Sequence, residues 1–87
     1  MSASFNNQHE GIAPASNAFA ITPHDSNALT NVVRGIYVGG AGDIKVNMAG
    51  TGTAVVFTGV PAGTLLPIRA TLVYATGTDA TSLVGIY

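Results

Sequence analysis

Three consecutive residues, His24, Asp25 and Ser26, carry the side-chain types of a hydrolytic triad. A triad works through a hydrogen-bond relay from acid to imidazole to hydroxyl, and its members are assembled across space. Here the three residues lie between Pro23 and Asn27. Asp and Ser in such a stretch cap the backbone groups of a turn. The spacing therefore predicts a turn and no catalytic site.

Metal-binding residues are equally sparse. The chain has two histidines, His9 and His24, and no cysteine. Disulfides and zinc–thiolate sites are thereby excluded, and a metal site needs three or four ligands in one cluster. His9 and Glu10 would need subunits meeting on a symmetry axis to form a site, and nothing in the sequence requires one. We expect no metal and no cofactor.

A glycine-rich run, Gly39 to Gly42, offers a possible phosphate loop. Phosphate loops lead into a helix, usually with a lysine, whereas Asp43 and a strand pattern follow here. The run therefore predicts a hairpin turn. Asp43 and Asp79 are the only acids in residues 31–87, too few for a general acid/base pair. We expect no enzymatic activity.

The composition indicates a surface covered by other protein. Charged residues make up 8% of the 87 residues and hydrophobic residues 47%, against roughly 25% charged in an average domain. Three basic residues cannot neutralise many phosphates, so nucleic-acid binding is excluded. No apolar run is long enough to span a membrane, and the N-terminus has no signal-peptide pattern. One small domain without disulfides is marginally stable alone, which favours oligomerisation.

The chain divides into a predicted N-terminal arm, residues 1–30, and a β domain, residues 31–87. The arm lacks periodicity, and its apolar residues recur singly. That spacing suits an arm lying in grooves of a neighbouring subunit, while the alternative is a disordered terminus. The apolar residues concerned are Phe5, Ile12, Phe19, Ile21 and Leu29.

Residues 31–87 predict an all-β fold. Beta-branched residues and glycine dominate, and Gly and Pro separate the apolar runs. In the second run Ile44 and Val46 alternate with Lys45 and Asn47, which predicts one buried and one exposed face. Five or more short strands with tight connections predict a small antiparallel sandwich or barrel. The predicted strands are Val32–Val38, Asp43–Met48, Thr53–Thr58, Leu66–Tyr74 and Thr81–Tyr87.

Two arginines and a terminal tyrosine complete the candidate interface set. Arg34 and Arg69 each lie in a predicted strand among apolar or small residues. Either their stems cover the sheet surface, or they form ion pairs with carboxylates of a neighbouring subunit. Tyr74 shares an apolar face and is expected in the core, whereas Tyr87, at the end of an apolar strand, is an interface candidate. With Phe5, Ile12, Phe19 and Ile21, these residues form the predicted interface.

Several blocks of the sequence occur in a recognisable order. They run from Ile21-Thr22-Pro23-His24-Asp25 through Val33–Asp43 and Gly59–Arg69 to Ala75–Thr81. Over residues 16–87 the chain resembles the small spike base proteins of gene transfer agents and tailed phages. The resemblance implies a non-enzymatic virion component on the capsid surface that carries a spike or fibre. The residues shared with that family include no catalytic set.

The leading hypothesis is a homo-oligomeric head protein, a trimer or pentamer, that binds the major capsid protein and presents a spike or fibre. It is made in the host cytoplasm and used in the virion. A vertex position predicts fivefold symmetry. The alternatives are a capsid decoration (cement) protein, for which threefold symmetry is expected, a virion adaptor, and a small carbohydrate-binding module.

Overall fold

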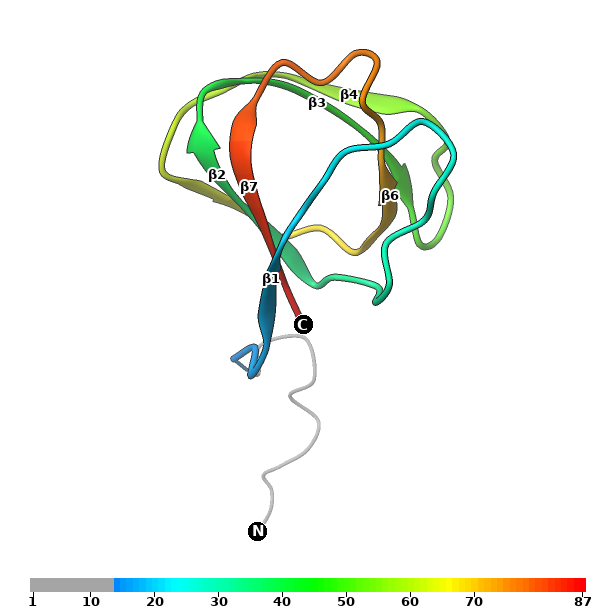
Figure 1. The fold of residues 1–87 in the computed structure, drawn as a ribbon, viewed down its shortest axis with the longest axis vertical. Helices are drawn as coiled ribbons and strands as arrows, with labels where there is room; N and C mark the ends of the chain where they lie inside the picture. The colour runs from blue at the N-terminus through cyan, green and yellow to red at the C-terminus, as the bar shows by residue number, and fades with distance from the viewer. Residues whose placement is uncertain (1–13) are drawn as a thin grey trace, which may run out of the picture.

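The computed structural model describes residues 14–87, which form an all-β fold of seven strands in two sheets, as the sequence predicts (Figure 1). No helix in this part of the chain is long and apolar enough to cross a membrane. The strands are β1 (Ala18–Ala20), β2 (Gly35–Gly40), β3 (Gly42–Met48), β4 (Val55–Val60), β5 (Thr64–Leu66), β6 (Ala70–Val73) and β7 (Thr81–Ile86).

Three pairs of consecutive strands each pass from one sheet to the other. One sheet has the order β1-β7-β2-β5 and the other the order β4-β3-β6, with antiparallel pairing throughout. The pair β2–β3 therefore occupies the centre of both sheets. The pair β4–β5 flanks it on one side, and β6–β7 flanks it on the other.

The junction between β2 and β3 is a crossing between sheets, so the predicted hairpin at Gly39 to Gly42 is wrong. Only Ala41 separates the two strands, which do not pair with each other. The N–H groups of Asp79 and Ala80 donate to the carbonyl of Asp43, at 2.8 and 3.1 Å. A Cβ atom at position 42 would lie 2.6 Å from the backbone nitrogen of Ala80. Glycine is thus required here because another segment of backbone packs against the bend.

The strand predicted over Leu66–Tyr74 is two strands, because the chain leaves the first sheet at Pro67. Proline has no N–H to donate to a ladder. The N–H of Ile68 donates to the carbonyl of Leu66 at 2.9 Å, a tight turn that ends β5. The chain then enters the second sheet as β6.

A bulge in β6 breaks the predicted alternation of faces. The register between β3 and β6 shifts between Asn47 and Met48, so that Ala70 and Val73 are both buried in the core. An extra residue in one strand has this effect because side chains otherwise alternate with a period of two. Tyr74, expected in the core, is half-buried outside the core cluster.

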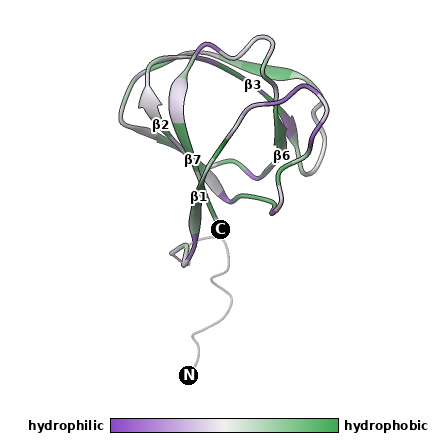
Figure 2. Cartoon of the chain, in the orientation of Figure 1, coloured by the Kyte–Doolittle hydropathy of each residue, from purple (hydrophilic) through white to green (hydrophobic). Residues whose placement is uncertain are grey.

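The core lies between the sheets and is aliphatic. As predicted, β3 directs Ile44 and Val46 inward. Burying such a side chain contributes roughly 1.5–3 kcal/mol. Hydrophobic residues follow the strands, and hydrophilic residues gather in the connecting segments (Figure 2). The cluster comprises Ile21, Val33, Ile36, Val38, Ile44, Val46, Val60, Ala70, Val73, Ala80 and Leu83.

Residues 18–33 run along the outer side of β6–β7. Strand β1 pairs with β7 and was not predicted from the sequence. Farther along, the N–H groups of His24, Leu29 and Val33 donate to carbonyls of β6 at 2.9, 2.8 and 3.2 Å. These bonds occupy backbone groups that an edge strand would otherwise leave open.

The close packing of the Ala80 backbone against Gly42 predicts that alanine substitutions at Gly42 and Gly50 change stability by different amounts. Gly42→Ala should destabilise the fold by about 1–3 kcal/mol, because the new methyl group meets backbone that cannot rotate away. Gly50→Ala is the matched control, since no atom lies within 4 Å of its added Cβ. Thermal unfolding followed by circular dichroism measures both. Equal melting temperatures for the two variants would refute the packing argument.

Candidate functional site

His24, Asp25 and Ser26 form a turn, as the sequence predicts. The Nδ1 atom of His24 accepts the N–H groups of Ser26 and Asn27, each at 3.1 Å. The Ser26 hydroxyl lies 3.3 Å from the same nitrogen. The carboxylate of Asp25 accepts hydrogen bonds from Thr76 instead of orienting the imidazole. The geometry therefore provides no relay from acid to hydroxyl.

The Asp25 carboxylate joins this turn to the connection between β6 and β7. Its Oδ1 atom accepts the Thr76 N–H at 2.8 Å, and its Oδ2 atom accepts the Thr76 hydroxyl at 2.7 Å. These bonds stabilise the charged form, so the backbone and then the side chain of Thr76 hold the pKa of Asp25 below its ordinary value of 3.8. These hydrogen bonds thereby join the turn at His24, Asp25 and Ser26 to the β6–β7 pair.

Of the predicted interface residues, Phe19 and Tyr87 lie together. Their rings are 5.6 Å apart in an edge-to-face arrangement, with an interplanar angle of 67°. Ile21 is buried in the core of its own chain, and its N–H donates to Leu83 at 2.9 Å. Phe5 and Ile12 lie outside the described residues.

The two arginines occupy separate, exposed places. The N–H of Arg34 donates to the carbonyl of Ile86 at 2.8 Å, next to Tyr87. Arg69 lies in the connection between β5 and β6, where its carbonyl accepts the N–H of Ala49 at 2.8 Å. The structure thus brings Arg34 near the Phe19–Tyr87 pair along the backbone and leaves Arg69 elsewhere.

On the outer face of the three-stranded sheet, polar side chains contact one another. The Lys45 ammonium lies 4.9 Å from the centre of the Tyr74 ring. The Tyr74 hydroxyl donates to the Asn47 carbonyl oxygen at 2.9 Å, and the N–H of Ala54 donates to the same atom at 2.8 Å. Because these groups bond one another, this face offers few polar groups to a ligand.

The outer face of the four-stranded sheet is apolar. Strand register places Ala20 opposite Val84, Val84 opposite Tyr37, and Tyr37 opposite Leu65, so one row of side chains crosses all four strands. Tyr37 and Leu65 are exposed. Neither residue was predicted from the sequence to lie on the surface. Gly35 and Gly39 lie two residues before and after Tyr37, so Tyr37 is the one large side chain on that side of β2.

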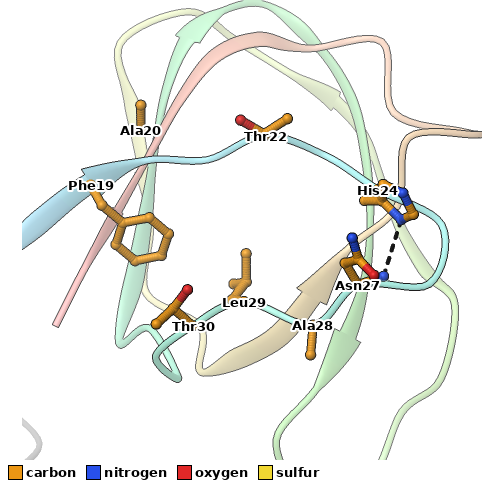
Figure 3. A pocket seen from close by; sticks show the side chains of 8 residues that line it. All are labelled: Phe19, Ala20, Thr22, His24, Asn27, Ala28, Leu29 and Thr30. Atoms are coloured by element: carbon orange, nitrogen blue, oxygen red, sulfur yellow. Dashed lines mark hydrogen bonds between the residues drawn. The ribbon is translucent and has the colours of Figure 1, made fainter.

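A hollow of about 260 Å³ opens between β1 and residues 27–30 (Figure 3). Phe19 and Leu29 point into it from the two segments, and both pack against the core. Thr22 and Thr30 also line it, and no carboxylate, lysine or arginine does. Within residues 14–87, no three His, Cys, Asp or Glu side chains gather into a metal site. His24 is the one titratable side chain among the residues that line the hollow.

The hydrogen bonds from Thr76 to the Asp25 carboxylate predict that the stability difference between wild type and an Asp25 variant depends on pH. Asp25→Ala should melt at a lower temperature than wild type at neutral pH. Because the folded-state pKa is lowered, that difference should be complete above 3.8 and decrease as the pH falls toward the lower folded-state pKa. Thermal unfolding from about pH 6 to about pH 2 measures it. Thr76→Val, which keeps the N–H donor, should show a smaller loss, and a difference independent of pH would contradict the assignment.

Comparison with known proteins identifies a relative among the solved structures. No family model matches the sequence, and no curated protein matches it. Among solved structures, a chain from "Capsid of native GTA particle computed with C5 symmetry" has the same fold, with a TM-score of 0.80. The two sequences are 34% identical, and the match covers 98% of this chain and 100% of the other. Identity at that level over the whole of both chains means that this chain belongs to a family of gene transfer agent capsid-particle proteins.

Proposed function

We propose that this chain is a non-enzymatic structural protein of a phage-like particle, specifically a homo-oligomeric base that docks on the capsid surface and carries a spike or fibre. The observation that carries the proposal is the full-length match to a chain of a gene transfer agent capsid particle. The site agrees with it, because the triad-like residues form a turn and the hollow beside Phe19 is lined by no carboxylate, lysine or arginine.

The surface supports association with protein. Large apolar side chains are exposed on several strands, and charged residues make up only 8% of the sequence. Exposed apolar residues of this kind mark interaction sites when they gather into patches. The major capsid protein and a spike or fibre protein are the proposed partners, besides further copies of this chain.

A capsid cement protein is the second candidate. Cement joins capsomers around threefold positions, whereas a spike base at a vertex meets fivefold symmetry. A virion adaptor elsewhere on the particle is a third structural role. A carbohydrate-binding module is disfavoured, because the chain has no tryptophan with which to build an aromatic platform.

Deleting the gene for this chain distinguishes the two main candidates. Loss of a spike base should remove projections from the particles and leave heads intact with an unchanged bursting temperature. Loss of a cement protein should lower the bursting temperature instead. Electron microscopy and a thermal release assay on mutant particles measure the two effects, with a complemented strain as control. Unchanged projections and unchanged bursting would refute both roles.

The predicted arm provides a second test. Deleting residues 2–13 should leave the melting temperature of the β domain close to that of the full chain, since the strands and core described above lie in residues 14–87. If the arm binds the capsid or a neighbouring subunit, attachment to purified heads should weaken. A sedimentation binding assay with full-length protein as reference measures it, and equal attachment would refute the docking role of the arm.

A further inference from the structure

The chain covers the edge of β6 with residues 24–33, a segment that we name the strap. The N–H groups of His24, Leu29 and Val33 donate to carbonyls of β6 at 2.9, 2.8 and 3.2 Å. An open strand edge is a template for pairing with other chains, so covering it protects the fold. The contacts that hold the strap in place therefore determine whether this edge is available.

The strap begins with an imidazole that acts as a hydrogen-bond acceptor. The Nδ1 atom of His24 accepts the N–H groups of Ser26 and Asn27, each at 3.1 Å (Figure 3). A backbone N–H group can only donate, so this ring nitrogen carries no proton, and the neutral ring carries its proton on Nε2. The folded turn at residues 24–27 thus uses the uncharged form of His24.

Protonation reverses the role of the Nδ1 atom. An imidazolium has an N–H group on both ring nitrogens, so Nδ1 would present a donor to the N–H groups of Ser26 and Asn27. Both of these groups would lose their acceptor. The hydrogen bonds to Nδ1 therefore contribute fully above the range in which histidine titrates, about pH 5 to 8, and are lost as the pH falls through it.

Asp25 is the charged neighbour that opposes this effect, because its carboxylate attracts the imidazolium of His24. Strands β1 and β6 contain no titratable residue. The other titratable groups in segments beside the strap are Tyr74 and Asp79 between β6 and β7, Lys45 over the Tyr74 ring, and Arg34 after the end of the strap. Attraction by Asp25 thus favours the charged ring, and loss of the Nδ1 acceptor disfavours it.

The Asp25 carboxylate is a second titratable acceptor in the same turn. It accepts the N–H and the hydroxyl of Thr76 at 2.8 and 2.7 Å. These bonds hold the pKa of Asp25 below its ordinary value of 3.8. The carboxylate therefore stays charged, and keeps its bonds to Thr76, throughout the range in which histidine takes up a proton.

We propose that the strap is an acid-sensitive cover of the β6 edge, which loosens in two steps. Protonation of His24 opens the turn at residues 24–27, and protonation of Asp25 at lower pH releases this turn from Thr76. The first step also changes the rim of the hollow beside Phe19, because His24 and Asn27 both line it. After the second step, no side-chain bond secures the end of the strap where the His24 N–H meets Val73. The inference goes beyond the proposed function and does not depend on it.

Nuclear magnetic resonance of the full, isotopically labelled chain tests the proposal from about pH 8 to about pH 2. At neutral pH the ring nitrogens of His24 should show the Nε2–H tautomer. Between about pH 8 and about pH 5, the protection of the Ser26 and Asn27 amides against hydrogen exchange should fall about two- to tenfold, the factor for one typical hydrogen bond. Protection of the Thr76 amide should fall only below pH 3.8.

Two histidine variants provide the matched comparison. His24 is exposed, so His24→Gln is expected to fold, and it should abolish the change at Ser26 and Asn27 between about pH 8 and about pH 5. His9→Gln removes the other histidine of the chain and should leave that change intact. Protection is corrected for the intrinsic dependence of exchange on pH, and circular dichroism checks folding.

Other outcomes overturn the proposal. An Nδ1–H tautomer at neutral pH would contradict the acceptor role of His24, and this measurement needs no variant. Equal protection of Ser26 and Asn27 across the histidine range would show that the turn does not respond to protonation. A Thr76 amide that loses protection together with Ser26 would refute the two steps. Attachment of the chain to purified heads tests the proposed function separately, and neither result depends on the other.

Discussion

The consecutive strands β2 and β3 lie inside the two sheets, and the other strands are placed by pairing with them or with their neighbours. Strands β2 and β3 differ in sheet but are separated by a single residue, Ala41. Strands β5 and β7 pair with β2, and β4 and β6 pair with β3. The bend between β2 and β3 therefore determines how the two sheets face each other and where the core lies. It exists because Gly42 leaves room for the backbone of Ala80.

This arrangement has a consequence for the edges. The pair β2–β3 has β6–β7 on one side, which is the first flank, and β4–β5 on the other side, which is the second flank. The chain covers the first flank itself with residues 18–33, using main-chain bonds and the Asp25 carboxylate on Thr76. It has no remaining segment among the described residues that covers the second. No charged residue occurs in sequence between Lys45 and Arg69, the stretch that contains β4 and β5 of that second flank.

The proposed function depends on surfaces rather than on a reacting site. The residues with catalytic types are occupied in turns, and the polar groups of the three-stranded sheet bond one another. The relative in a gene transfer agent capsid particle shares the fold over the whole length of the chain. A structural role requires no pocket for chemistry, but it does require stable edges and faces that fit neighbouring proteins. The apolar row through Tyr37 and the hollow beside Phe19 are features of that kind.

The sequence alone was sufficient for the properties that depend on local patterns. Alternation of Ile44 and Val46 with polar residues predicted the buried face of β3, and Pro23 with Asp25 and Ser26 predicted a turn. Composition also predicted a non-enzymatic protein whose surface meets other protein, and this stays a prediction. Only the tertiary structure decided that the glycine run crosses between sheets, that Leu66–Tyr74 divides at Pro67, and that Phe19 belongs to an ordered strand on the edge of β7. These outcomes depend on which distant segments pack together, such as Ala80 against Gly42, and no local periodicity encodes that choice.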